Sequence, residues 1–185
     1  SYPTGFTPFN GALYFQANGP ASGTGELWKT DGTAGGTVLV KSLTNSSTSI
    51  ADLIVVGSML YFTGEEITST GRELWRSDGT TAGTIVVKNI ASSFGSSPHD
   101  LVNYNGTLYF VADDGVRGDQ IWRSDGTDSG TVMVHEIYNS VPSNYPKPKT
   151  LVPLGSKLLF LQTRDGYGTE WWQTDGTPGG LTIVS

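Results

Sequence analysis

Glu26-Leu27-Trp28-Lys29-Thr30-Asp31-Gly32-Thr33 is a segment that recurs three more times along the chain, at residues 73–80, 120–127 and 170–177. The tryptophans at the third place of the motif are 47, 47 and 50 residues apart. These tryptophans are Trp28, Trp75, Trp122 and Trp172. Four copies at a nearly fixed period indicate a repeat architecture in which each unit is one supersecondary structure.

Each unit contains four short runs rich in Val, Ile, Leu, Tyr, Phe and Trp, separated by Gly, Asn, Asp and Ser, which is typical of strands and turns. A Leu-Tyr-Phe run (Leu-Leu-Phe in the last unit) precedes the motif and a β-branched run follows it. Asn10-Gly11 and Asn105-Gly106 fall between the first two runs, where a tight hairpin needs residues that tolerate positive φ. No stretch has a helical period.

The pattern predicts an all-β fold, a β-propeller built from four four-stranded antiparallel blades in a single domain. The blades are expected at approximately residues 1–45, 46–93, 94–140 and 141–185. The first strand begins near Phe6 and the fourth strand of the last unit ends at Ser185, so no strand exchange joins the ends. Two arrangements follow: four blades that close directly, which is our preferred expectation, or part of a larger propeller completed by another chain or segment.

Composition excludes several classes of function. The 185 residues carry 11 basic and 17 acidic side chains, for a net charge of −6 and no basic run. Nucleic-acid binding and membrane insertion are therefore not expected. The absence of cysteine excludes disulfides and thiolate metal sites.

The motif Glu-Leu-Trp-x-x-Asp-Gly-Thr, with the Gly-Thr and Val-rich strand that follow it, resembles the ELWxxDGT repeat of large bacterial, often secreted, proteins. The resemblance covers essentially the whole chain and departs from the pattern at Gln120, Trp171 and Leu181. It implies a β-propeller-like repeat protein that is extracellular or on the cell surface. It implies no catalytic activity.

Binding is expected on the disc edge formed by the second-to-third loops and the blade connections, because these segments differ between units while the Asp-Gly-Thr edge is uniform. The recurring tryptophans are interpreted as packing residues. Trp171 replaces Leu or Ile of the other units and points to the opposite sheet face from Trp172, so it is a candidate ligand contact. Tyr167, Asp165 and Arg164 are the further ligand candidates in the same unit.

The recurring acids, Asp31, Asp78, Asp125 and Asp175, are interpreted as acceptors of hydrogen bonds from their own turns. One acid per turn does not supply the six to eight oxygens that calcium takes. Glu65, Glu66, Asp113 and Asp114 are the calcium candidates on the variable edge. No other cofactor is expected.

The chain is expected not to be an enzyme, because its two histidines have no metal-binding spacing and no nucleophile or phosphate-binding motif is present. A hydrolase that uses carboxylates is the enzymatic alternative. The sequence favours a non-enzymatic extracellular binding or adhesion module whose partner is a carbohydrate or a surface protein. The alternative is a structural repeat protein that assembles into surface layers or filaments, with a homo-oligomer as partner.

Overall fold

The computed structural model describes residues 2–18, 25–43, 50–65, 71–91, 95–136, 148–164, 168–177 and 179–184. These residues form four sheets of four antiparallel strands, and each sheet keeps its strands in chain order. Blade 1 contains β1 (Thr4–Phe9), β2 (Ala12–Asn18), β3 (Gly25–Thr30) and β4 (Val38–Leu43), and blade 2 contains β5 (Ala51–Val56), β6 (Met59–Glu65), β7 (Arg72–Ser77) and β8 (Ile85–Lys88). Blade 3 contains β9 (His99–Tyr104), β10 (Thr107–Asp113), β11 (Asp119–Ser124) and β12 (Val132–His135), and blade 4 contains β13 (Lys149–Leu154), β14 (Lys157–Arg164), β15 (Gly168–Thr174) and β16 (Thr182–Val184). The predicted propeller blades are confirmed.

The motif forms the third strand of every blade and pairs in register with the Leu-Tyr-Phe run. Phe62 faces Trp75 across β6 and β7, and Phe110 faces Trp122 across β10 and β11. Residues that face each other on neighbouring strands lie on the same side of the sheet. Phe and Trp of one unit therefore form one continuous apolar face, and the Leu before Trp lies on the other face.

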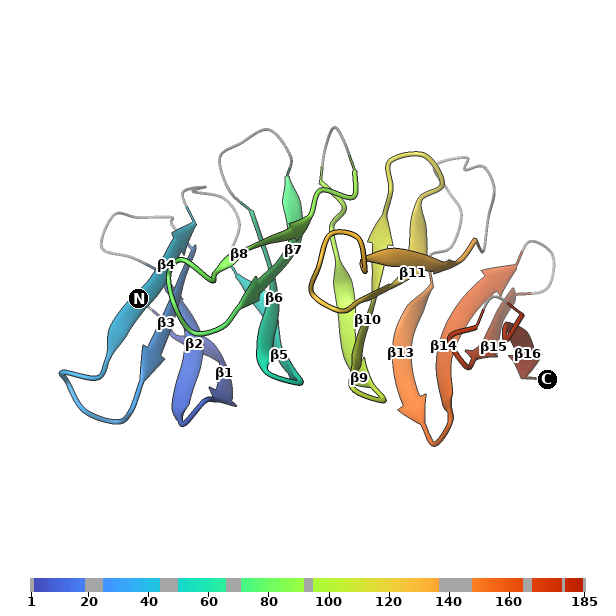
Figure 1. Cartoon of the computed structure of the whole chain (residues 1–185). Helices are drawn as coiled ribbons and strands as arrows, with labels where there is room; N and C mark the ends of the chain where they lie inside the picture. The colour runs from blue at the N-terminus through green and yellow to red at the C-terminus, as the bar shows by residue number, and fades with distance from the viewer. Residues whose placement is uncertain are drawn as a thin grey trace.

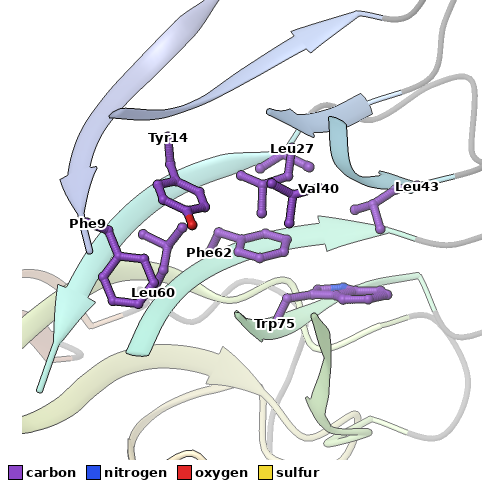
Figure 2. Close-up of a cluster of buried hydrophobic side chains, with 9 residues drawn as sticks. Phe9, Tyr14, Leu27, Val40, Leu43, Leu60, Phe62 and Trp75 are labelled. Carbon is purple, nitrogen blue, oxygen red and sulfur yellow. The ribbon is translucent and has the colours of Figure 1, made fainter. Parts of the chain in front are cut away.

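Each blade packs on the next through these two faces. The outgoing face is the one turned toward the following blade, and in blade 1 it consists of Phe9, Tyr14, Leu27 and Val40. The incoming face is the one turned toward the preceding blade, and in blade 2 it is built around Leu60, Phe62 and Trp75. Figure 2 shows the blade 1 side chains lying over those of blade 2. The core is thus three successive clusters, one at each junction between blades.

The blades form an open arc. Neighbouring blades meet along their first strands, in the order β1, β5, β9 and β13. Blade 1 lies at one end of the arc and blade 4 at the other (Figure 1). The expectation that four blades close directly is not met, and the alternative of part of a larger propeller fits this arrangement. A repeat specifies which faces pack, but the angle between blades sets how many complete a ring.

Candidate functional site

The two ends of the arc present faces that are buried everywhere else in the molecule. The outgoing face of blade 4 carries Leu154, Leu159, Trp171 and Val184 at the positions that Phe9, Tyr14, Leu27 and Val40 occupy in blade 1. Leu154 is 63% exposed, whereas its counterparts Phe9, Val56 and Tyr104 are at most 6% exposed. Trp171 is 41% exposed, whereas Leu27, Leu74 and Ile121 are 0% exposed. The difference arises because no blade among the described residues covers the outgoing face of blade 4.

The incoming face of blade 1 is uncovered in the same way. Phe15 and Trp28 are only half-buried, although the corresponding Phe62 and Phe110 are inaccessible to solvent. Leu39, which pairs with Trp28 on the same face, is 44% exposed. Phe6 lies beside Phe15, with 5.6 Å between ring centroids. Both ends of the arc therefore expose large apolar side chains that belong to blade–blade contacts.

The position of Trp171 explains why it differs from the other units. It lies on the outgoing face and pairs with Leu161 and Val184, so it is not part of the loop edge. In the other blades this face combines a tyrosine on the second strand with Leu or Ile on the third. Blade 4 has Leu159 and Trp171 instead, so the aromatic ring has moved one strand outward and the face stays apolar.

The Asp-Gly-Thr turns are held together by their own acids. In the third copy, Asp125 Oδ1 accepts hydrogen bonds from the Thr127 amide (2.8 Å) and the Thr127 hydroxyl (2.7 Å). These hydrogen bonds hold the pKa of Asp125 below its ordinary value. The same pair of hydrogen bonds occurs at the other three acids, and it lowers the pKa of each. The three further acids are Asp31, Asp78 and Asp175.

In blades 2, 3 and 4 the turn also receives the tyrosine hydroxyl of the preceding blade. The glycine of the turn has a positive φ, and a side chain at Gly126 would lie 2.6 Å from the Tyr61 hydroxyl. Gly79 and Gly176 meet the hydroxyls of Tyr14 and Tyr109 in the same manner. Gly32, in blade 1, has nothing within 4 Å of that position, since no blade among the described residues packs on the incoming face of blade 1.

A pocket of about 450 Å³ opens between the first two turns. Its lining includes Tyr14, Lys29, Asp31 and Asp78. Lys29 Nζ donates to the Gly79 carbonyl oxygen at 3.0 Å, so the ammonium group ties blade 1 to blade 2. The pocket lies on the edge formed by the Asp-Gly-Thr turns, which is uniform between units and is predicted from the sequence to be structural.

Both histidines form contacts between strands. His135 Nε2 in blade 3 lies 2.6 Å from the Thr174 hydroxyl in blade 4, and burial lowers the pKa of His135. Thr174 is the counterpart of Ser77, whose hydroxyl is paired with Thr84 inside its own turn. Blade 4 has Leu181 at the place of Thr84, so the histidine of the preceding blade supplies the missing partner. His99 Nε2 lies 3.3 Å from the buried carboxylate of Asp119, and this hydrogen bond raises the pKa of His99.

Glu73 fastens the connection between blades 2 and 3. Its carboxylate accepts hydrogen bonds from the Ser96 hydroxyl (2.5 Å) and the Ser96 amide (3.2 Å). The Ser96 carbonyl oxygen in turn accepts the Asp113 amide hydrogen at 2.9 Å. Burial raises the pKa of Glu73 from 4.5 to about 7, and the hydrogen bonds from Ser96 oppose that rise only in part.

The raised pKa of Glu73 predicts that the stability of the chain depends on pH. Its folded pKa lies above its ordinary value, so its contribution is complete below pH 4.5 and is lost as the pH rises through about 7. We expect the free energy of unfolding of the native chain to fall by about 1–2 kcal/mol relative to Glu73→Gln across this interval. Urea unfolding of both chains at a series of pH values measures the difference. A difference that stays constant between pH 4.5 and 7 would contradict the assignment.

The calcium candidates are only partly described. Asp113 Oδ1 accepts the Gly115 amide hydrogen at 2.7 Å. Asp114 accepts the amides of Val116 and Arg117, and its second oxygen lies 2.7 Å from the Arg117 guanidinium. Glu65 ends β6, and Glu66 lies outside the described residues. No group of three metal-ligating side chains is found in the described part of the chain, so calcium binding stays a prediction.

The remaining ligand candidates do not gather at a described surface. Arg164 ends β14, and Asp165 and Tyr167 lie outside the described residues. Trp171, the candidate whose side chain the structure places, belongs to the end face of the arc. Apart from Trp171, the residues of the two end faces were not among the ligand candidates predicted from the sequence, although the repeat identifies their positions. Over the described residues, no helix is long and apolar enough to span a membrane.

Comparison with known proteins gives structural neighbours alone. No protein-family model matches the chain, and no curated protein matches it. A mutant of puromycin hydrolase is similar over 98% of this chain and 28% of its own length, with a TM-score of 0.64 and 14% identity. A prolyl endopeptidase is similar over 95% of this chain and 26% of its own, with a TM-score of 0.63 and 20% identity. The chain thus spans about a quarter of these proteins, and identities this low show the fold.

A third neighbour is itself a propeller domain, that of the Trilobed protease from Pyrococcus furiosus, whose topology is described as open velcro. The match covers 94% of this chain and 53% of that domain, with a TM-score of 0.56 and 10% identity. The four blades therefore superpose on about half of that propeller domain.

These comparisons correct the expectation of an adhesion module. The neighbours described above are two peptidases and a protease propeller, and TolB structures also match, with no carbohydrate-binding, adhesion or surface-layer protein among them. The expectation of a carbohydrate-binding or adhesion module, with its alternative of a layer or filament protein, was wrong. Its physical basis also fails, because Trp171 lies on the outgoing face of blade 4, which no described blade covers, and not on the loop edge.

Proposed function

We propose that the chain is a non-enzymatic scaffold module that forms part of a β-propeller ring with more than four blades. The observation that carries this proposal is the exposure of Leu154, Trp171 and Val184 at positions that are covered in the preceding blades. Exposed apolar patches of this kind mark interaction sites. The module would supply four blades and two apolar ends to a larger ring.

The match of this chain to about half of the protease propeller domain supports the proposal. It concerns the fold alone, and the fold is what the proposal is about. A blade cannot bury both of its faces by itself, and stacking of neighbouring units is what buries the core of a repeat protein. Propellers typically contain four to eight blades. An open arc of four blades is compatible with the upper part of that range.

The described polar groups support a non-enzymatic role. Thr174 beside His135 resembles a hydroxyl activated by a base, but Thr174 is 0% exposed and also accepts the Gly176 amide hydrogen. Asp119, which pairs with His99, is buried as well. Both pairs tie strands or blades together, and the carboxylate of Asp119 and the hydroxyl of Thr174 are closed to solvent.

The proposal is tested by small-angle X-ray scattering of the dilute chain and by a turnover assay. We expect the scattering curve of an open arc, as in Figure 1, and no hydrolysis of a panel of fluorogenic peptides. The calculated curve of a compact four-blade disc serves as the comparison. A curve that fits the compact disc would overturn the open arc, and peptide turnover that copurifies with the chain would overturn the non-enzymatic role.

A further inference from the structure

The two ends of the arc are complementary to each other. At every internal junction, the outgoing face of one blade packs on the incoming face of the next. The outgoing face of blade 4 and the incoming face of blade 1 are therefore the two kinds of surface that pack on each other inside the arc. Among the described residues, these are the two blade faces without a neighbouring blade. Each end therefore carries the kind of apolar blade face on which the other kind packs at the internal junctions.

We propose that two copies of the chain join end to end at both ends and form a closed ring of eight blades. This inference rests on the proposed function and names the partner. Blade 4 of each copy packs on blade 1 of the other, so the same contact is made twice around a two-fold axis. Closed two-fold symmetry is the commonest arrangement of soluble homo-oligomers, and it leaves no end face open.

The internal junctions serve as the template for this contact. Between blades 1 and 2, Leu27 and Val40 lie over Phe62 and Trp75 (Figure 2). In the joined ring Trp171 and Val184 occupy the places of Leu27 and Val40, and Phe15 and Trp28 occupy the places of Phe62 and Trp75. The contact is therefore apolar on both sides, as in the three junctions already present.

The polar contact at the rim of the junction can also be made. Lys29 Nζ donates to the carbonyl oxygen of Gly79 in the next blade. Gln173 stands at the place of Lys29 in blade 4, and its side-chain amide donates one hydrogen to Thr182 Oγ1 at 3.1 Å, which leaves a second hydrogen for the Gly32 carbonyl oxygen of the second copy. Gly32 has open space where the internal turns receive a tyrosine hydroxyl.

The outgoing face of blade 4 differs from the internal ones in two residues but stays apolar. An internal outgoing face has tyrosine on its second strand and Leu or Ile on its third, as in Tyr61 with Leu74. Blade 4 exchanges these for Leu159 and Trp171, which moves the aromatic ring one strand outward and keeps the face apolar, as packing on a second copy requires. The match to about half of a propeller domain agrees with two arcs per ring.

The mass of the chain in solution tests the proposal, measured by light scattering and sedimentation over a concentration series. We expect a species of twice the 19.7 kDa chain mass that does not grow further with concentration. Trp171→Glu on the outgoing face and Leu39→Glu on the incoming face each weaken the association on the order of 100-fold. Val116→Glu is the matched control, because Val116 is 71% exposed and lies on neither face.

A mixing experiment establishes that the contact runs from outgoing to incoming face. Trp171→Glu retains an intact incoming face and Leu39→Glu an intact outgoing face, so an equimolar mixture recovers one good junction and associates more tightly than either variant alone. Circular dichroism and the urea midpoint verify that both variants stay folded. A pair joined through two outgoing faces would leave Leu39→Glu unaffected and overturn the proposal.

The remaining outcomes separate this inference from the proposed function. A chain that scatters as an open arc and stays monomeric at high concentration overturns the two-copy ring and retains the scaffold module, whose ends would then be covered by other blades. Open-ended growth with concentration overturns the closed ring in the same way. A compact four-blade disc overturns both.

Discussion

Phe110→Ala is expected to lower the free energy of unfolding by about 3–5 kcal/mol, whereas Phe15→Ala lowers it by less than about 1.5 kcal/mol. Both residues hold the same position in the second strand of their blades. Phe110 is 0% exposed in the junction between blades 2 and 3, so its removal leaves a cavity. Phe15 lies on the half-exposed incoming face of blade 1, where solvent fills the space.

The measurement is urea unfolding followed by tryptophan fluorescence, at a chain concentration low enough for a monomer. Phe62→Ala, at the junction between blades 1 and 2, is the second internal variant and should match Phe110→Ala. Equal losses for Phe15→Ala and Phe110→Ala in the monomer would show that blade 1 is covered within the same chain and would contradict the open arc.

Gly126→Ala is expected to destabilise the chain by about 2–5 kcal/mol, well beyond Gly32→Ala. The two glycines have φ values of 90° and 92°, so alanine meets the same backbone strain at both, about 1–2 kcal/mol. At Gly126 the new methyl group also meets the Tyr61 hydroxyl at 2.6 Å, which adds the cost of overpacking. At Gly32 it meets open space.

Tyr61→Phe provides the internal control, because it removes the hydroxyl and keeps the ring. In a double-mutant cycle, Gly126→Ala should cost less in the Tyr61→Phe background than in the native chain. Thermal and urea unfolding of the four chains give the coupling energy. Identical costs in the two backgrounds, or equal losses at Gly32 and Gly126, would refute the tyrosine–glycine contact.

The blades could be predicted from the sequence because their determinants are local. The alternation of the Leu-Tyr-Phe run and the motif, with turn residues between them, specifies strands and their pairing within about 50 residues. The opposite faces of Trp171 and Trp172 also follow from the strand period. Four copies repeated the same signal, which made the type of each element clear.

What could not be predicted depends on contacts between blades. The repeat does not encode the angle between neighbouring sheets. The sequence was therefore compatible with both a closed disc and an open arc. The loss of a threonine at Leu181 could be seen in the sequence. Its replacement by His135 could not, because His135 is 39 positions away from Thr174, whose hydroxyl it contacts. Glu73 likewise bonds Ser96, 23 positions away in a connecting segment. Such partners follow from the tertiary arrangement alone.

The three junctions use the same positions on both sides, and this has a consequence for how the chain can change in length. Any blade with this pattern can follow any other, so duplication or loss of a whole unit by recombination needs no new interface. Copy number is then free to vary while the packing rule stays constant. Leu159, Trp171 and Leu181 are the exceptions to this uniformity and distinguish blade 4 from the other three units.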